Sequence, residues 1–215
     1  MERRNIFEEL KLAIMRGVFK PRERLVEREL AERFEASRTP IREAIRKWES
    51  IGMVRIIPNQ GAKVADFSPQ DIDALFKVRI CVEKLAMEFA CSDSTHKKIT
   101  NEIRTLIKLN QDLICAVSSD DFAKIVEFDQ KFHLTLLGLS ENPYLMRVIE
   151  ELRLKSYPIS YYLWKSKMNL RTSISEHKRM IKAIQRKDAT GLTFIVEKQL
   201  NNAKNSYLEY LNKQS

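Results

Sequence analysis

Three side chains in the second half of the chain have the types and spacing of metal ligands. Asp129 and His133 lie four residues apart, so on a helix they share one face. That face also carries apolar residues at helical spacing, namely Ile125, Phe128, Phe132 and Leu136. His177 lies in a second apolar stripe, between Ile174 and Ile181. Because buried ligand-type groups without a partner are costly, we predict that these three side chains share one divalent metal ion.

Two other interpretations of the same residues stay open. A buried histidine is often a core residue satisfied by one hydrogen bond, which would make the second half of the chain a metal-free dimerisation module with a polar core. An Asp-x3-His pair with a third ligand also resembles the metal centre of a hydrolase or an oxygenase. Against an enzyme, the sequence places no second acid as a general base and has no paired Glu-x-x-His motifs. We therefore expect no catalytic residues.

A second set of functional side chains lies in the stretch SRTPIREAIR, residues 37–46. Arg38, Arg42 and Arg46 follow one another at intervals of four, so a helix places them on one face. Ser37 or Thr39 can cap the start of that helix. The opposite face is apolar and carries Ile41, Ala44, Ile45 and Trp48. Arginine can bind O6 and N7 of guanine together, and hydroxyls suit phosphates, so the stretch is typical of a DNA-reading helix.

The surrounding elements predict how this helix is positioned. Residues 4–16 and 27–34 are expected to form two further helices, with GVFKPRERL as an extended connector between them. The runs VRII and AKVADF around a Pro58–Gly61 turn predict a hairpin. Two short helices joined by a short turn, followed by a hairpin, indicate a winged helix-turn-helix domain over residues 1–66.

The rest of the chain, residues 67–215, predicts an all-helical antiparallel bundle, so the fold class is mainly α. Pro158 should kink or break its helix near Tyr157. The expected helices span residues 69–91, 97–118, 120–139, 143–168, 174–187 and 189–212.

Composition limits the class of protein and its compartment. The net charge is +9, of which +5 falls within residues 1–65, and this concentration favours a polyanionic partner for the N-terminal part. The three cysteines form no CxxC pair, which argues against a disulfide framework. The charged N-terminus does not resemble a signal peptide, and no apolar run is long enough to span a membrane. We therefore expect a cytoplasmic protein with no membrane association.

The motifs of both parts resemble one known family. Residues 10–65 resemble the winged-helix domain of the GntR regulators through ERELAERF, SRTPIREAI and the NQG wing tip. Residues 68–215 resemble the helical FCD-type effector domain of the FadR-like branch through VRICVEKLA, DQKFH, SENPYL and SEHKRMIKAIQRKDA. The resemblance implies a homodimeric transcription regulator, acting as a repressor, that binds a palindromic operator in double-stranded DNA and responds to a small organic acid.

The resemblance also assigns roles to individual residues. The implied DNA contacts are Arg28, Ser37, Arg38, Thr39, Arg42, Gln60 and Gly61, with Arg46 reduced to a supporting charge. Many members of the branch hold a divalent metal with one Asp and three His, and Asp129, His133 and His177 match the first three ligands. Gln199 falls where the fourth histidine is expected, which should weaken binding of Zn²⁺, Ni²⁺ or Mn²⁺. Arg79 matches a family position and is expected either to bind the effector carboxylate or to pair with Glu83.

Overall fold

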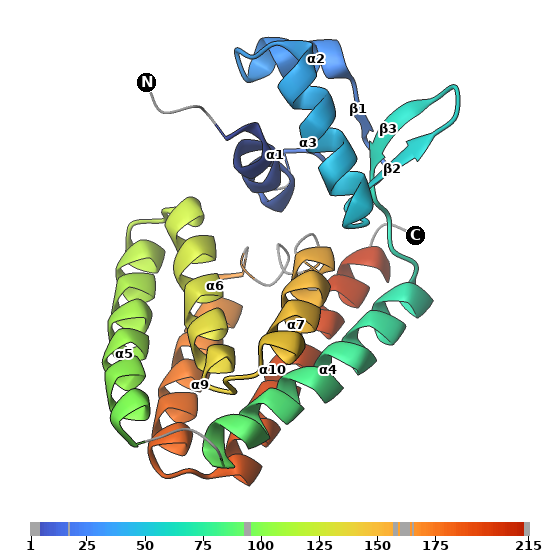
Figure 1. The fold of residues 1–215 in the computed structure, drawn as a ribbon. Coiled ribbons are helices and arrows are strands. Elements are labelled where there is room, and N and C mark those ends of the chain that lie inside the picture. The colour runs from blue at the N-terminus through green and yellow to red at the C-terminus, as the bar shows by residue number, and fades with distance from the viewer. Residues whose placement is uncertain are drawn as a thin grey trace.

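The computed structural model describes residues 5–16, 18–92, 96–156, 159, 164 and 166–212 of the chain. A small unit of helices and short strands comes first, and a larger helical unit follows it (Figure 1). The predicted boundary at residues 66 and 67 lies in the short connection between the two units, which has no regular secondary structure. The fold is mainly α, as the sequence predicted.

The N-terminal unit is a winged helix. Its strands form one antiparallel sheet in the order β1-β3-β2, in which Lys63 of the central strand lies opposite both Arg24 and Arg55. In chain order the elements are α1 (Ile6–Met15), β1 (Arg24–Leu25), α2 (Glu27–Arg33), α3 (Arg38–Ser50), β2 (Val54–Ile57) and β3 (Gly61–Val64).

Helix α3 is amphipathic in the way that its spacing predicted. Ile41, Ala44, Ile45 and Trp48 are buried, and the ring of Trp48 stacks on Phe7 of α1 with 4.5 Å between centroids. The arginine face remains exposed to solvent. Burial of the apolar stripe therefore fixes the orientation of the helix and turns its basic face toward solvent.

The segment GVFKPRERL contains more structure than the extended connector expected from the sequence. Its described part holds β1, and the backbone N–H of Val64 also donates to the carbonyl of Glu23 beside that strand. A strand of two residues is too short to show an alternating pattern, so only its pairing with β3 reveals it. This third strand ties the start of α2 to the wing.

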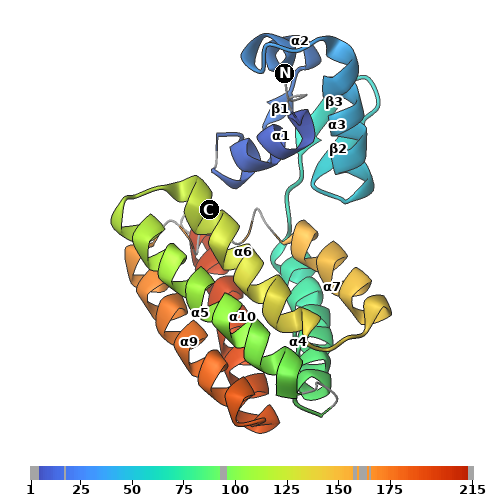
Figure 2. The ribbon, with the colours of Figure 1, turned by 60° about the vertical axis from the view of Figure 1, so that its left-hand side comes forward.

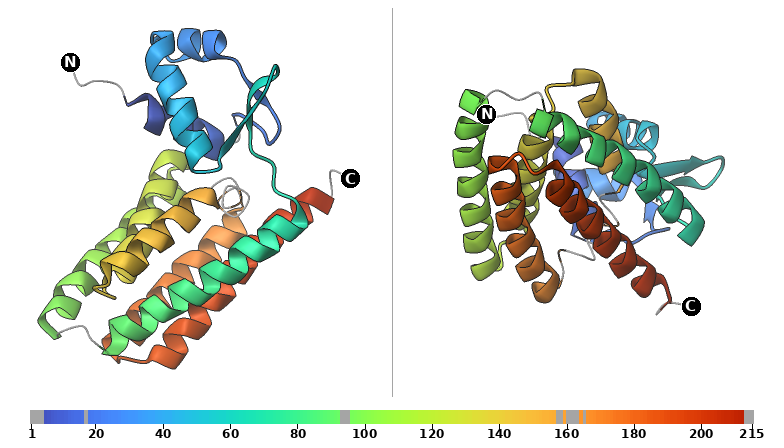
Figure 3. Two further views of the ribbon diagram at one scale, coloured as in Figure 1. Left: turned by 45° about the vertical axis from the view of Figure 1, so that its right-hand side comes forward. Right: turned by 90° about the horizontal axis from the view of Figure 1, so that it is seen from below.

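The C-terminal unit is an antiparallel helical bundle, as predicted. Helix α4 packs against α10 and α7, while α5 packs against α6 and α9. Figure 2 shows α5, α6, α9 and α10 running alongside one another, and Figure 3 shows the bundle from the side and from below. The helices are α4 (Pro69–Ser92), α5 (His96–Ser118), α6 (Phe122–Gly138), α7 (Pro143–Lys155), α9 (Lys167–Gln185) and α10 (Ala189–Asn212).

Two of the predicted helices had wrong bounds. The helix expected over 143–168 ends as α7 at Lys155, where the hydroxyl of Ser156 donates to the carbonyl of Arg153. The helix expected to begin at 174 begins as α9 at Lys167, because Ser166 caps it by accepting from the N–H of Asn169. Helical periodicity continues across both ends, so it did not reveal them. The kink predicted near Tyr157 and Pro158 lies outside the described residues.

Apolar side chains connect the two units. The cluster that contains Trp48 of the winged helix continues into the bundle through Leu113, Ala116, Ile125, Val126, Trp164 and Leu170. A second cluster fills the rest of the bundle around Phe76, Phe132 and Tyr207. Among the described residues, no helix is both long enough and apolar enough to cross a membrane.

Candidate functional site

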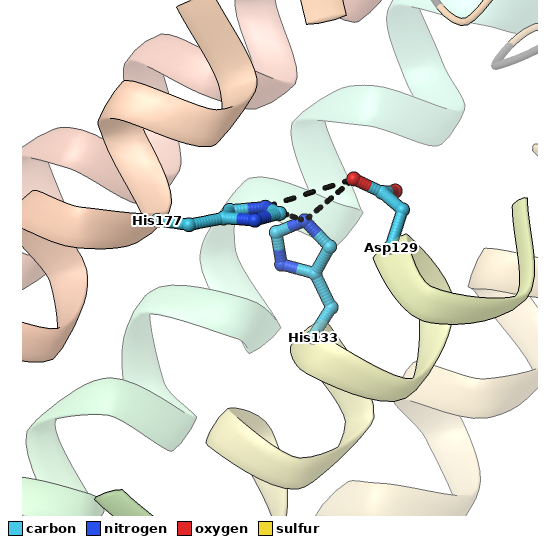
Figure 4. Close-up of side chains that lie close together, drawn as sticks. All are labelled: Asp129, His133 and His177. Atoms are coloured by element: carbon cyan, nitrogen blue, oxygen red, sulfur yellow. Dashed lines mark hydrogen bonds and ion pairs between the residues drawn. The ribbon is translucent and has the colours of Figure 1, made fainter. Parts of the chain in front are cut away.

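Helices α6 and α9 bring the three predicted ligands together inside the bundle. Asp129 and His133 project from α6 toward His177 of α9 (Figure 4). The Nε2 atoms of the two histidines are 3.3 Å apart. Oδ1 of Asp129 is 3.6 Å from Nε2 of His177 and 4.0 Å from Nε2 of His133. All three side chains are buried, with at most 8% of each exposed.

The geometry of this cluster fits a shared divalent ion. Donor atoms bound about 2.1 Å from one ion lie roughly 3 to 4 Å apart, which matches the three separations. The other ring nitrogen of His177, Nδ1, lies 3.2 Å from Oδ1 of Asn110. A proton on Nδ1 donated to this oxygen leaves the lone pair of Nε2 directed at Asp129 and His133. Two imidazoles and one carboxylate are a donor set that suits Zn²⁺, Ni²⁺ or Mn²⁺.

Further hydrogen bonds hold Asp129 and connect Gln199 to it. The indole Nε1 of Trp164 donates to Oδ2 of Asp129 at 3.1 Å, and the hydroxyl of Ser173 donates to Oδ1 at 3.5 Å. Nε2 of Gln199 donates to the same hydroxyl at 3.1 Å. The residue at the expected fourth-ligand position therefore contacts the cluster through Ser173.

Burial controls the protonation of the cluster. It raises the pKa of Asp129 to about 6, against the lowering effects of Arg153 and the hydrogen bonds from Trp164 and Ser173. Burial also lowers the pKa of His177 to about 3 and that of His133 well below its ordinary value, and Arg153 lowers both further. At neutral pH the histidines are thus neutral and Asp129 is ionised, which are the protonation states of metal ligands.

Two buried arginines flank the cluster and share one carboxylate. Arg79 donates from Nη2 to Oε1 of Glu83 at 2.7 Å, and Arg153 donates from Nη1 to Oε2 of Glu83 at 3.1 Å. Nη1 of Arg79 also donates to the hydroxyl of Ser156 at 2.7 Å. Two guanidinium groups and one carboxylate carry a net charge of +1. The pair between Arg79 and Glu83, one of the two expectations for Arg79, is present.

A small cavity joins the arginines to the proposed ligands. Its volume is about 40 Å³, which is room for a few water molecules rather than for a ligand of many atoms. Arg79, Arg153, Asp129, His133 and Gln199 all contribute to its lining. Arg79 therefore takes part in the ion pair and borders the cavity, so the two expectations for it are compatible.

Sequence reasoning did not single out Arg153, Asn110 and Ser173, and two of these residues carried a usable signal. Arg153 follows the buried Ile149 by four residues, and Asn110 lies between the buried Leu106 and Leu113. Polar residues within an apolar stripe of a helix are expected to point inward. For Ser173 the sequence offered no comparable signal.

The predicted DNA contacts lie on the winged helix and are all exposed. Ser37 occupies the N-cap of α3, but its side chain makes no capping hydrogen bond. Arg42 donates to both carboxylate oxygens of Glu27, at 3.0 and 2.8 Å. Gln60 accepts a hydrogen bond from Nζ of Lys63 at 2.8 Å. Glu35, in the turn before α3, has a positive φ of 50°, which is a strained backbone conformation for a residue other than glycine.

Two family models match the chain. Residues 2–64 match the gntR family of bacterial regulatory proteins, and residues 74–200 match the FCD domain. The chain belongs to the GntR family, among the members that carry an FCD domain. A GntR regulator of this type binds DNA through its helix-turn-helix and binds an effector through its FCD domain.

Relatives of this GntR regulator agree with the assignment. It is 28% identical over 182 residues to the HTH-type transcriptional regulator YdhC of Bacillus subtilis, covering 85% of this chain and 80% of that one. It is 30% identical over 159 residues to the Nta operon transcriptional regulator of Aminobacter aminovorans, covering 74% of this chain and 72% of that one. The structure of Escherichia coli McbR/YncC superposes with a TM-score of 0.78 at 25% identity, covering 95% and 96% of the chains. These proteins are transcription regulators, so the hydrolase or oxygenase alternative gains no support.

Proposed function

We propose that this GntR regulator is a cytoplasmic homodimeric repressor whose DNA binding is controlled by a small organic acid at a divalent metal site in the FCD domain. The observation that carries the proposal is the convergence of Asp129, His133 and His177 at a cavity that two buried arginines also line. We assign residues 1–66 to DNA binding and residues 67–215 to effector binding and dimerisation.

The metal would be held by Asp129 Oδ1 and by Nε2 of His133 and His177. A bound Zn²⁺, Ni²⁺ or Mn²⁺ would supply a positive charge and open coordination positions for a carboxylate. Gln199 borders the same cavity and is assigned to the effector side of the site. Arg79 and Arg153 add positive charge and bidentate donors for the same anion.

Entry of an effector requires the site to rearrange. The cavity is too small for an organic acid of several carbons, and Glu83 already occupies both arginines. An effector carboxylate must therefore compete with Glu83 and displace neighbouring side chains. Asp129 also bonds Trp164, whose ring belongs to the apolar cluster shared with the winged helix, so a change at the ligands reaches the DNA-binding unit.

The DNA contacts we assign are Arg28, Ser37, Arg38, Thr39, Arg42, Gln60 and Gly61. They are exposed on α2, on α3 and at the wing, and α3 carries the guanidinium groups that can read guanine in a major groove. One recognition helix makes too few base contacts for useful specificity, so we expect two half-sites in a palindromic operator.

An exposed apolar surface supports dimerisation. Val78 and Leu85 on α4 are 49% and 40% exposed, and Tyr144 and Val148 on the neighbouring α7 are 79% and 46% exposed. Exposed apolar side chains on neighbouring helices are candidates for an interaction surface, which a second copy of this chain can cover symmetrically. Repression is supported by the gluconate operon transcriptional repressor of Bacillus licheniformis. That protein is 25% identical to this chain in an alignment that covers 84% of this chain.

Thermal melting tests the metal site directly. Chelator-treated protein should melt at a higher temperature when Zn²⁺, Ni²⁺ or Mn²⁺ is added, because an ion that binds only the folded state stabilises it. His133→Gln should abolish the shift, whereas Lys131→Gln, on the exposed face of the same helix, should retain it. No shift with any of the three ions would favour the metal-free dimerisation module.

A further inference from the structure

Three arginines border a groove on the winged helix, and they differ in whether they are already paired with a carboxylate. The groove lies between α3 on one side and β1 and β3 on the other, and its volume is about 360 Å³. Arg42 and Arg46 line it from α3, Arg24 lines it from β1, and Gly61 lies at its wing end. All three arginines are exposed, so the groove combines strong positive charge with access for a polyanion.

Arg42 is already bound within the protein. Its guanidinium makes two hydrogen bonds with the carboxylate of Glu27, in the bidentate arrangement that is the strongest for this pair. The pair lowers the pKa of Glu27 and raises that of Arg42, with the hydrogen bond as the largest cause for both. Arg42 and Glu27 together are electrically neutral, so they add no net attraction for phosphate.

Arg24 and Arg46 differ from Arg42 in this respect. Within the described part of the chain, neither has a hydrogen bond or an ion pair to a carboxylate. The guanidinium of Arg24 lies beside Gly61, whose missing side chain and φ of 80° leave the backbone of the wing open there. Arg46 lies one helical turn beyond Arg42 on the opposite wall.

The sheet places an additional cation next to Arg24. Lys63 lies directly opposite Arg24 on the neighbouring strand, and Arg55 lies opposite Lys63 on the next one. Like charges directly opposite one another destabilise a sheet. A bound polyanion would offset the repulsion within this row of three cations.

We propose that Arg24 and Arg46 bind the phosphate backbone of double-stranded DNA from the two walls of this groove. Glu27 is a positioning residue that holds the guanidinium of Arg42. This inference rests on the proposed function, since it presumes that α3 binds DNA. It changes the roles expected from the sequence: Arg46, reduced to a supporting charge there, becomes a principal contact, and Arg24 joins the interface.

The salt dependence of DNA binding measures these contacts. Full-length protein is titrated onto a fluorescent 30-base-pair duplex of random sequence by anisotropy at several KCl concentrations. Each phosphate contact contributes about 0.9 to the slope of log K against log salt. We expect Arg24→Ala and Arg46→Ala each to lower the slope by about 0.9 per bound subunit. Arg24→Lys and Arg46→Lys should preserve it, because an ammonium also neutralises a phosphate.

One control variant completes the experiment. Arg104→Ala removes an exposed arginine of α5, outside the winged helix, and should leave the slope unchanged. Melting curves establish that every variant is folded.

The outcomes separate the two proposals. If wild-type protein binds the duplex but the two alanine variants keep its slope, the inference is refuted and the proposed function stands. A loss of about 0.9 in Arg104→Ala as well would show that the slope does not arise at this groove, and would overturn the inference. If the wild-type protein binds no duplex at 50 mM KCl, both the inference and the proposed function fail.

Discussion

The buried carboxylate of Glu83 offers the sharpest test of how the FCD domain is held together. It accepts hydrogen bonds from Arg79 and Arg153, and the three side chains are 3%, 4% and 7% exposed. Glu83→Gln keeps the shape of the side chain but removes its charge. Two guanidinium groups then face each other across a neutral amide in a site with little access to water, and we expect a large loss of stability.

The size of the expected loss in stability follows from the burial of Glu83 and its two arginine partners. Removing one partner of a buried ion pair costs about 3–5 kcal/mol, and the amide retains one acceptor, so we take about 3 kcal/mol. In a chain of this length, each kcal/mol lowers the melting temperature by about 2–4 °C, which predicts a decrease of about 6–12 °C. Wild-type and variant protein are compared by circular dichroism at one protein concentration, because the melting temperature of the proposed dimer would depend on concentration.

A matched variant and an anion complete the test. Glu88→Gln removes an exposed carboxylate from the same helix and should change the melting temperature by less than about 2 °C. Sodium acetate should stabilise Glu83→Gln more than the wild type, because the two freed arginines can bind its carboxylate. A Glu83→Gln protein that melts within 2 °C of the wild type would show that Arg79 and Arg153 do not need this counter-ion.

Three further predictions concern the metal site. Gln199→His should raise the affinity for Zn²⁺ by at least about tenfold, measured by competition with a chelating dye, because imidazole is a better ligand than an amide; unchanged affinity would place residue 199 out of reach of the ion. Asn110→Ala should weaken Zn²⁺ binding by about 10–100-fold in the same assay through loss of the partner of His177 Nδ1, whereas an equal affinity would remove Asn110 from the site. Because folding raises the pKa of Asp129 to about 6, this carboxyl favours the folded state at low pH and loses that contribution as the pH rises through 6. Metal-free Asp129→Asn should therefore gain stability relative to the wild type at pH 8 but not at pH 4.5, and the same difference at both pH values would contradict the shift.

Features that depend on residues close in sequence were predictable. Apolar spacing identified the buried face of α3, and the i, i+4 relation placed Asp129 and His133 on one inward face. The position of His177 in an apolar stripe correctly indicated that it is buried. Helix periodicity predicts which residues share a face, because residues three or four apart are neighbours on any helix. The end of α7 and the start of α9 escaped the same reasoning, since both depend on the hydroxyl groups of Ser156 and Ser166 rather than on the apolar pattern.

Whether a charged side chain of the site is already paired depends instead on contacts between segments that are distant in sequence. Arg79 has a partner one turn away in Glu83, which the sequence could indicate, but Arg153 reaches the same carboxylate from α7. Only the packing of α4 against α7 makes that carboxylate shared and leaves the cluster with a net positive charge. In the same way, β1 places Glu27 at the start of α2 within reach of Arg42, so an arginine that looked available for DNA is already paired. An arginine's residue type and helix face therefore show where its charge lies, whereas its availability to a ligand depends on which carboxylates the tertiary fold brings to it.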